Sequence, residues 1–94
     1  MNMSYIVKLT KKAKKSMNKL DKATKDRINK ALINLIDYYD GKNVSEPDVK
    51  ILKGKYFGLL RLRVGNYRII FKLEENELII LILEIVARGS AYKK

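Results

Sequence analysis

Four arginines and one tyrosine have the chemistry to act on a phosphate group: Arg61, Arg63, Arg68, Arg88 and Tyr92. Guanidinium groups bind phosphate oxygens in pairs and stay charged, so a cluster of them can stabilise the negative charge that builds up in phosphoryl transfer. Beside such cations a tyrosine hydroxyl ionises more easily and could accept a proton from a ribose 2′-hydroxyl. The alternative is structural, because alternating arginines suit the solvated face of a sheet and a terminal tyrosine can pack on it.

Glu84 interrupts an otherwise apolar segment near the end of the chain. A carboxylate there could serve as a general base. It could equally be one half of an ion pair, since partly buried carboxylates are usually paired. Arg88 is about 13 Å away along a strand, too far for easy contact. We therefore expect a cross-strand partner such as Arg68 or Arg61.

Lysines form a second basic surface and raise the formal net charge to +11. Such a charge attracts polyanions over about 8–10 Å at physiological salt, so nucleic acid, an acidic protein and an anionic membrane are the candidate partners. Lysines on helix faces suit phosphate contacts without sequence preference, or simply keep the protein in solution. The expected RNA-binding residues are Arg63, Lys53, Lys55, Lys11, Lys12, Lys14, Lys15, Lys22 and Lys25.

The residue types that are absent restrict the chemistry. The chain has no cysteine and no histidine, which excludes disulfides, thiol nucleophiles and the usual general base near pH 7. We expect no metal and no cofactor. The longest apolar run, Leu78 to Leu83, is far shorter than the ~20 residues of a membrane helix, and Met1 to Tyr5 does not resemble a signal peptide. We expect a soluble, cytoplasmic protein.

The apolar spacing predicts the elements that must position these residues. Ser4 to Leu9 alternates as a short strand, and Thr10 and Asp21 are suited to cap two amphipathic helices, the second ending at Asp40-Gly41. From Leu60 onward the period changes to two, with a hairpin turn at Gly65-Asn66, where we expect positive φ angles.

One α+β domain over residues 1–94 follows from this order of elements. A helical hairpin should pack on a four-stranded, mainly antiparallel sheet in the order β-α-α-β-β-β, giving two layers. The segment from Leu78 to Ala87 should be the central strand, with Leu81 and Leu83 buried.

Two stretches resemble the RelE/ParE toxin superfamily: residues 52–71, with Leu60-Arg61-Leu62-Arg63-Val64-Gly65-Asn66-Tyr67-Arg68, and the ending Ala87-Arg88-Gly89-Ser90-Ala91-Tyr92. The resemblance to RelE implies a ribosome-dependent endonuclease that cuts messenger RNA by 2′-hydroxyl attack without a metal. It implies phosphate-binding or acid/base arginines at Arg61, Arg68 and Arg88, a base at Tyr92, and inhibition by an acidic antitoxin encoded nearby.

Several positions depart from the RelE pattern and keep other functions open, among them Arg61, which stands where RelE has a lysine, and Gly89 and Ser90 of the terminal signature. Leu59 stands where the family's nuclease site has a lysine, and Ala87 replaces the histidine that is common in the terminal signature. The resemblance to ParE implies instead an inhibitor of DNA gyrase without hydrolytic chemistry. A third alternative is a degenerate member that only binds RNA or its antitoxin.

Overall fold

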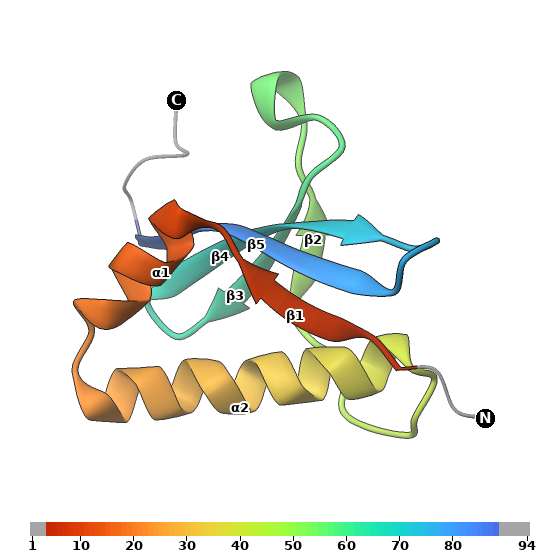
Figure 1. The fold of residues 1–94 in the computed structure, drawn as a ribbon, viewed down its shortest axis with the longest axis horizontal. Coiled ribbons are helices and arrows are strands. Elements are labelled where there is room, and N and C mark those ends of the chain that lie inside the picture. The colour runs from red at the N-terminus through yellow and green to blue at the C-terminus, as the bar shows by residue number, and fades with distance from the viewer. Residues whose placement is uncertain (1–3, 89–94) are drawn as a thin grey trace.

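The computed structural model describes residues 4–88, which form two helices on one face of a five-stranded sheet (Figure 1). The helices are α1 (Lys11–Asn18) and α2 (Lys22–Tyr39), and a short 3-10 turn, η1, spans Gly54–Tyr56. The strands are β1 (Ile6–Leu9), β2 (Val49–Ile51), β3 (Leu60–Val64), β4 (Tyr67–Glu74) and β5 (Ile79–Ala87), in the spatial order β1-β5-β4-β3-β2. Strand β1 pairs in parallel with β5, and the other pairs are antiparallel. The predicted α+β class and two-layer arrangement are confirmed.

The sheet has five strands, so the prediction of four was wrong. The additional strand is β2, which pairs Val49 with Leu62 and Ile51 with Leu60 along the outer edge of β3. It is only three residues long and begins two residues after Pro47. A strand this short shows no alternation that could be recognised in the sequence.

Strand β5 lies between β1 and β4, as an inner strand should, but the prediction that Leu81 and Leu83 are buried was wrong. The core residues of β5 are Ile80, Ile82 and Ile85. The register explains this spacing, since Phe71 pairs with Ile82 but Ile70 pairs with Glu84, leaving Leu83 as an extra residue. This irregularity brings Ile82 and Ile85 to the same face although they are three residues apart.

Both helices begin at the predicted residues. The Thr10 hydroxyl accepts a hydrogen bond from the Ala13 amide at 3.1 Å and donates one to the Leu83 carbonyl at 2.9 Å. Asp21 occupies the N-cap of α2 and accepts a hydrogen bond from the Thr24 hydroxyl at 2.5 Å. Ala13, together with Ile28, Leu32 and Leu35 of α2, completes the core. Neither helix is long and apolar enough to span a membrane, as judged over the described residues.

The turn of the β3–β4 hairpin lies at Gly65-Asn66, as predicted, but only Gly65 has a positive φ, of 57°. Asn66 therefore does not take the left-handed conformation that the sequence suggested. A glycine with positive φ at the first central position alone is the pattern of a type II′ hairpin turn. The hairpin keeps its two-residue length with one positive-φ residue instead of two.

Asp40, at the end of α2, joins that helix to the start of β1. Its carboxylate accepts hydrogen bonds from the Ser4 hydroxyl at 2.5 Å and from the Tyr5 amide at 2.9 Å. The Ser4 bond, followed by the Tyr5 bond, lowers the pKa of Asp40 below its ordinary value of 3.8. Because the folded protein favours the ionised form, Asp40 stabilises the fold above pH 3.8, and this contribution disappears as the pH falls through the lowered pKa.

We therefore expect Asp40→Asn to lower the free energy of unfolding at pH 7, with a difference from wild type that shrinks at acidic pH. Urea unfolding at several pH values measures this difference. Glu46→Gln, a change at an exposed carboxylate, should have little effect at any pH. A difference for Asp40→Asn that stays constant down to acidic pH would contradict the role given to the charge.

Candidate functional site

Several candidate site residues lie on the face of the sheet opposite the helical core. Arg61 of β3 pairs with Ile70 of β4, which pairs with Glu84 of β5, so all three side chains project from that same face. Strands lie about 4.8 Å apart, which places the Arg61 and Glu84 backbones about 10 Å from each other. We call this surface the open face. It is the face that the alternation of Arg61 and Arg63 with apolar residues predicted.

Arg61 is buried, with 7% of its surface exposed. Its Nη1 lies 3.6 Å from Oδ1 of Asp48, too long for a good hydrogen bond. Within residues 4–88, this buried Nη1 has no hydrogen-bond partner. A guanidinium that has lost its water without gaining full hydrogen bonding is costly. Arg61 is therefore not a solvated surface residue.

Glu84 is paired, but not with an arginine as predicted. Its Oε2 lies 2.9 Å from Nζ of Lys12 on α1, and its side chain is only 16% exposed. The hydrogen bond to Glu84, with the attraction between the two charges, raises the pKa of Lys12 above its ordinary value. This pairing arises because β1 ends at Leu9 and the Thr10 amide donates to the Ile82 carbonyl, which starts α1 beside β5.

Arginines gather around the β3–β4 turn. Arg63 and Arg68 are directly paired across the hairpin, and the Arg68 guanidinium bends back to the Gly65 and Tyr67 carbonyls at 3.4 and 3.3 Å. The Arg88 amide donates to the Asn66 carbonyl at 2.6 Å, which places the end of β5 beside the same turn. Over the part of the chain that the structure describes, none of these three arginines forms an ion pair.

Arg27 of α2 also reaches this turn, from the helical side. Its Nη1 lies 3.6 Å from the point where a Cβ on Gly65 would stand. Sequence reasoning missed Arg27, because nothing in the periodicity of α2 relates it to a hairpin far along the chain. We call Arg27, Arg63, Arg68 and Arg88 the arginine cluster. Arg63 and Arg68 carry like charges in direct opposition across the hairpin, an arrangement that favours a bound anion.

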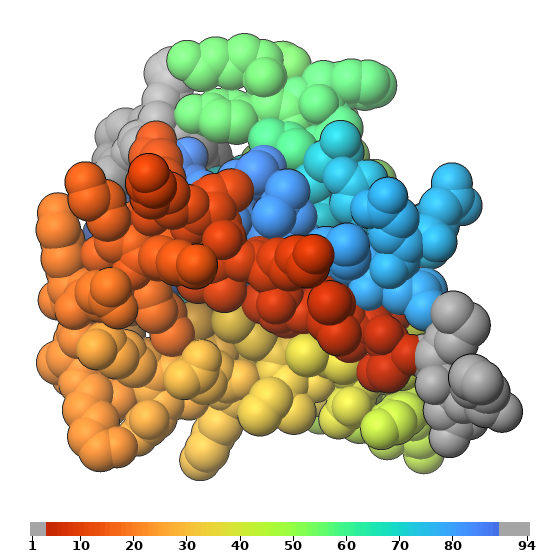
Figure 2. All heavy atoms as spheres, viewed as in Figure 1, coloured from red at the N-terminus to blue at the C-terminus, as the bar shows by residue number. Residues whose placement is uncertain are grey.

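The remaining predicted residues are spread around this centre. Tyr92 lies outside the described residues. Lys53 and Lys55 are exposed on the segment around η1, which rises on the side of the sheet away from α2 (Figure 1). Figure 2 shows β5 (blue) at the surface between α1 (orange-red) and that segment (green). Lys11, Lys14, Lys15 and Lys22 are exposed on the helices, Lys22 pairs with Asp26, and Lys25 is half-buried.

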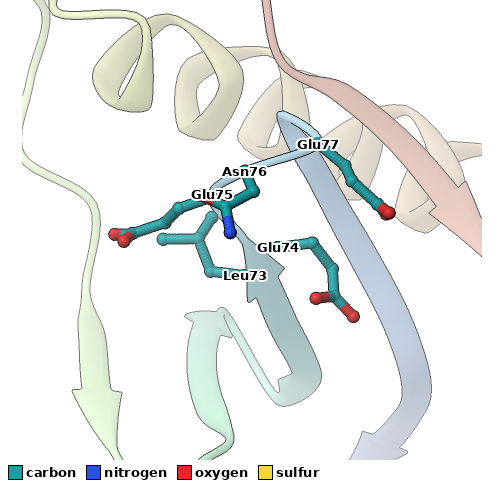
Figure 3. Close-up of a pocket in the computed structure, with 5 residues that line it drawn as sticks. All are labelled: Leu73, Glu74, Glu75, Asn76 and Glu77. Atoms are coloured by element: carbon teal, nitrogen blue, oxygen red, sulfur yellow. The ribbon is translucent and has the colours of Figure 1, made fainter.

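A hollow of about 310 Å³ lies at the other end of β4, at the turn into β5. It is lined by Leu73, Glu74, Glu75, Asn76 and Glu77 (Figure 3). Its three carboxylates would repel a phosphate. Glu75 points to one side and Glu74 and Glu77 to the other, and no group of side chains placed to hold a metal ion occurs between residues 4 and 88. The arginine cluster and the Glu84–Lys12 pair therefore form the better candidate site.

Comparisons with known proteins found a family model and solved structures that are similar to this chain. The sequence model of the ParE toxin of type II toxin-antitoxin systems, parDE, matches residues 7–92. A chain of the archaeal RelE-RelB complex from Pyrococcus horikoshii OT3 is 33% identical, with a TM-score of 0.69, over 95% of this chain and 100% of that one. No curated protein sequence matches the chain.

More distant structures share the fold. The isolated E. coli RelE toxin has 12% identity and a TM-score of 0.67, over 94% of this chain and 88% of its own. A chain of the heterotetrameric YoeB-YefM toxin-antitoxin complex from Staphylococcus aureus has 16% identity and a TM-score of 0.65, over 93% and 98%. With the family match over most of its length and these likenesses to RelE, the chain belongs to the RelE/ParE superfamily of type II toxins.

Proposed function

We propose that this toxin is a ribosome-dependent messenger RNA endonuclease that uses no metal. The observation that carries the proposal is the arginine cluster, in which several cations without carboxylate partners among residues 4–88 surround one hairpin turn. Structural cations on a sheet are normally paired or dispersed, since like charges in direct opposition are destabilising. Their concentration beside the half-buried Glu84, which holds the exposed Lys12, fits a site for a phosphate group in a polyanion.

The proposed reaction is an attack by a ribose 2′-hydroxyl on the adjacent phosphorus. The hydroxyl loses its proton to a base, for which we propose Tyr92, and the bond from phosphorus to the 5′-oxygen breaks. The products are a 2′,3′-cyclic phosphate and a 5′-hydroxyl, the latter completed by a proton from an acid. Arg68 and Arg88 stabilise the charge that develops on the phosphoryl oxygens. Because Arg61 is buried and its Nη1 is closed to solvent, its part in this scheme is to position its neighbours.

Glu84 has a more limited part in this scheme than that of a free base. Its carboxylate is held by Lys12 at 2.9 Å. We propose that Glu84 fixes the ammonium group of Lys12 at the edge of the open face, where it can contact the phosphate backbone. Lys53 and Lys55, with the exposed lysines of α1, extend the positive surface along the RNA.

Gyrase inhibition is the second candidate, and two observations favour it. Leu59 replaces a lysine of the RelE-type site, and the family model that matches the chain is that of ParE toxins. In this case the open face would dock onto a protein and the arginines would bind carboxylates. A toxin that only binds its target does not need Tyr92 as a base.

The two candidates predict different first effects in cells. Induced toxin should stop amino-acid incorporation before it stops DNA synthesis, and messages should be cut within translated regions. Pulse labelling with an amino acid and with thymidine, together with mapping of message ends, measures the order of events. Equal cutting of naked RNA by the purified protein would contradict ribosome dependence. Arrest of replication with intact messages would favour the gyrase inhibitor.

The arginines and lysines should contribute differently to cutting. Arg68→Ala and Arg88→Ala should each lower the cleavage rate by about 10²-fold, the scale for removing a preorganised charge stabiliser. Lys11→Gln and Lys14→Gln should mainly weaken binding and reduce its salt dependence. Arg68→Lys keeps the charge but loses the paired contact with phosphate, so it should restore only part of the activity. Small, equal losses for all variants would show that the arginines only attract RNA.

The proposed partner is an acidic antitoxin encoded beside the toxin. Complexes with RelB or YefM antitoxins are known for the similar proteins, and charge complementarity to this surface would accelerate association. Arg63 is exposed in the arginine cluster, so Arg63→Glu should slow antitoxin binding about 10-fold at low salt. Lys30→Glu makes the same charge change on the exposed surface of α2 and is the control. Stopped-flow association that slows equally for both variants would rule out docking at the cluster.

A further inference from the structure

The segment between β2 and β3 has a defined conformation although it carries little regular structure. The Leu52 amide donates to the Leu59 carbonyl at 3.0 Å and closes the segment at its base. Inside it, the Phe57 amide donates to the Gly54 carbonyl at 3.0 Å. Gly54 and Gly58 have φ angles of 67° and 90°, which only glycine adopts readily. These bonds and angles fix the direction in which the tip of the segment points.

Phe57, at that tip, is 84% exposed, more than any other large hydrophobic residue in the described chain. Single exposed apolar residues are common and need no explanation by themselves. The surroundings distinguish Phe57, since Lys53 and Lys55 are exposed on the same segment. Nζ of Lys55 lies 5.7 Å from the centre of the Tyr56 ring, so a cation stands next to the aromatic tip. An aromatic ring between cations is the composition of a surface that binds single-stranded nucleic acid.

The residue beside the aromatic tip lies near the Glu84–Lys12 pair of the candidate site. Tyr56, its half-buried neighbour, is near enough to Lys12 to contribute to that residue's raised pKa, and Lys12 is the partner of Glu84. Figure 1 shows the segment rising from the side of the sheet that α2 does not cover. An RNA strand with one phosphate on the open face would therefore pass Phe57 with a neighbouring nucleotide.

We propose that Phe57 stacks on an unpaired base of the bound RNA, while Lys53 and Lys55 contact the phosphates on either side. The inference rests on the proposed action on RNA and adds a binding residue to it. The phenyl ring carries no hydrogen-bonding group, so the contact accepts any base and contributes affinity without reading the sequence. A protein partner would bury Phe57 within a wider apolar patch, whereas the other exposed residues of this segment are lysines and glycines.

The test measures stacking directly, on a short single-stranded 2′-O-methyl RNA that contains one 2-aminopurine. This probe cannot be cut, because the attacking 2′-hydroxyl is blocked, and 2-aminopurine loses fluorescence when it stacks. Phe57→Ala should weaken binding about 10-fold, within the range for loss of one base–aromatic stack, and should abolish the quenching. Phe57→Tyr, which keeps the aromatic ring, should retain both. Lys53→Gln and Lys55→Gln should weaken binding but keep the quenching.

Ile51→Ala is the matched control, because Ile51 is 70% exposed but pairs with Leu60 and so belongs to the opposite face of the sheet. Unchanged affinity and quenching for Phe57→Ala, or an equal loss for Ile51→Ala, would overturn the proposal. A loss of antitoxin binding alone would assign Phe57 to the protein partner instead. Failure of wild type to cut translated messages, with quenching that still depends on Phe57, would refute the nuclease but keep the stacking site.

Discussion

Two helices cover only one face of the five-stranded sheet, and this one-sided cover is the constraint on which the remaining structure depends. Apolar side chains that face α1 and α2 form the core, including Leu62, Ile69 and Phe71. Side chains that point to the other face of the sheet must be solvated, form an ion pair or contact a ligand. Arg63 is exposed, Glu84 pairs with Lys12, and Arg61 is buried with incomplete hydrogen bonding. Within residues 4–88, the open face therefore keeps cations whose pairing is incomplete.

Acidic and basic residues of the sheet lie at opposite ends of strand β4. Acidic residues of the sheet collect at the β4–β5 turn, around Glu75, whereas the arginines collect at the opposite end of β4, around Gly65. Because the acidic residues and the arginines are separated in this way, they do not form ion pairs with each other among the described residues. The self-repulsion of the arginine cluster lowers the stability of the free protein, and either RNA or an acidic partner would relieve it. The same feature would account both for the proposed attraction to RNA and for the proposed inhibition by an antitoxin.

The sequence predicted the faces of the sheet well, because a period of two needs no knowledge of neighbours. The alternation through Arg61 and Arg63 placed both residues on the face opposite the core, as observed. Capping chemistry likewise located the starts of α1 and α2. Contacts that depend on register were beyond such reasoning, because the extra residue at Leu83 reverses the parity within β5.

Partners of the site residues were harder still to predict. The pairing of Glu84 with Lys12 depends on where β1 stops, and the approach of Arg27 to Gly65 depends on how α2 crosses the sheet. The burial of Arg61 was not foreseen, since an arginine between leucines on a strand is usually solvated. The role given to Tyr92 stays a prediction, because that residue lies outside the described part of the chain.

The chemical identity of the new RNA ends tests the central claim most directly. Messages isolated from translating ribosomes exposed to the toxin should carry 2′,3′-cyclic phosphates upstream of each cut and 5′-hydroxyls downstream, because the nucleophile is the substrate's own 2′-hydroxyl. Those ends should disappear when Arg68 and Arg88 are both replaced by alanine. Fragments that end in 3′-hydroxyls and 5′-phosphates, or messages that stay intact while the toxin arrests growth, would contradict the assignment of the arginine cluster to RNA cleavage.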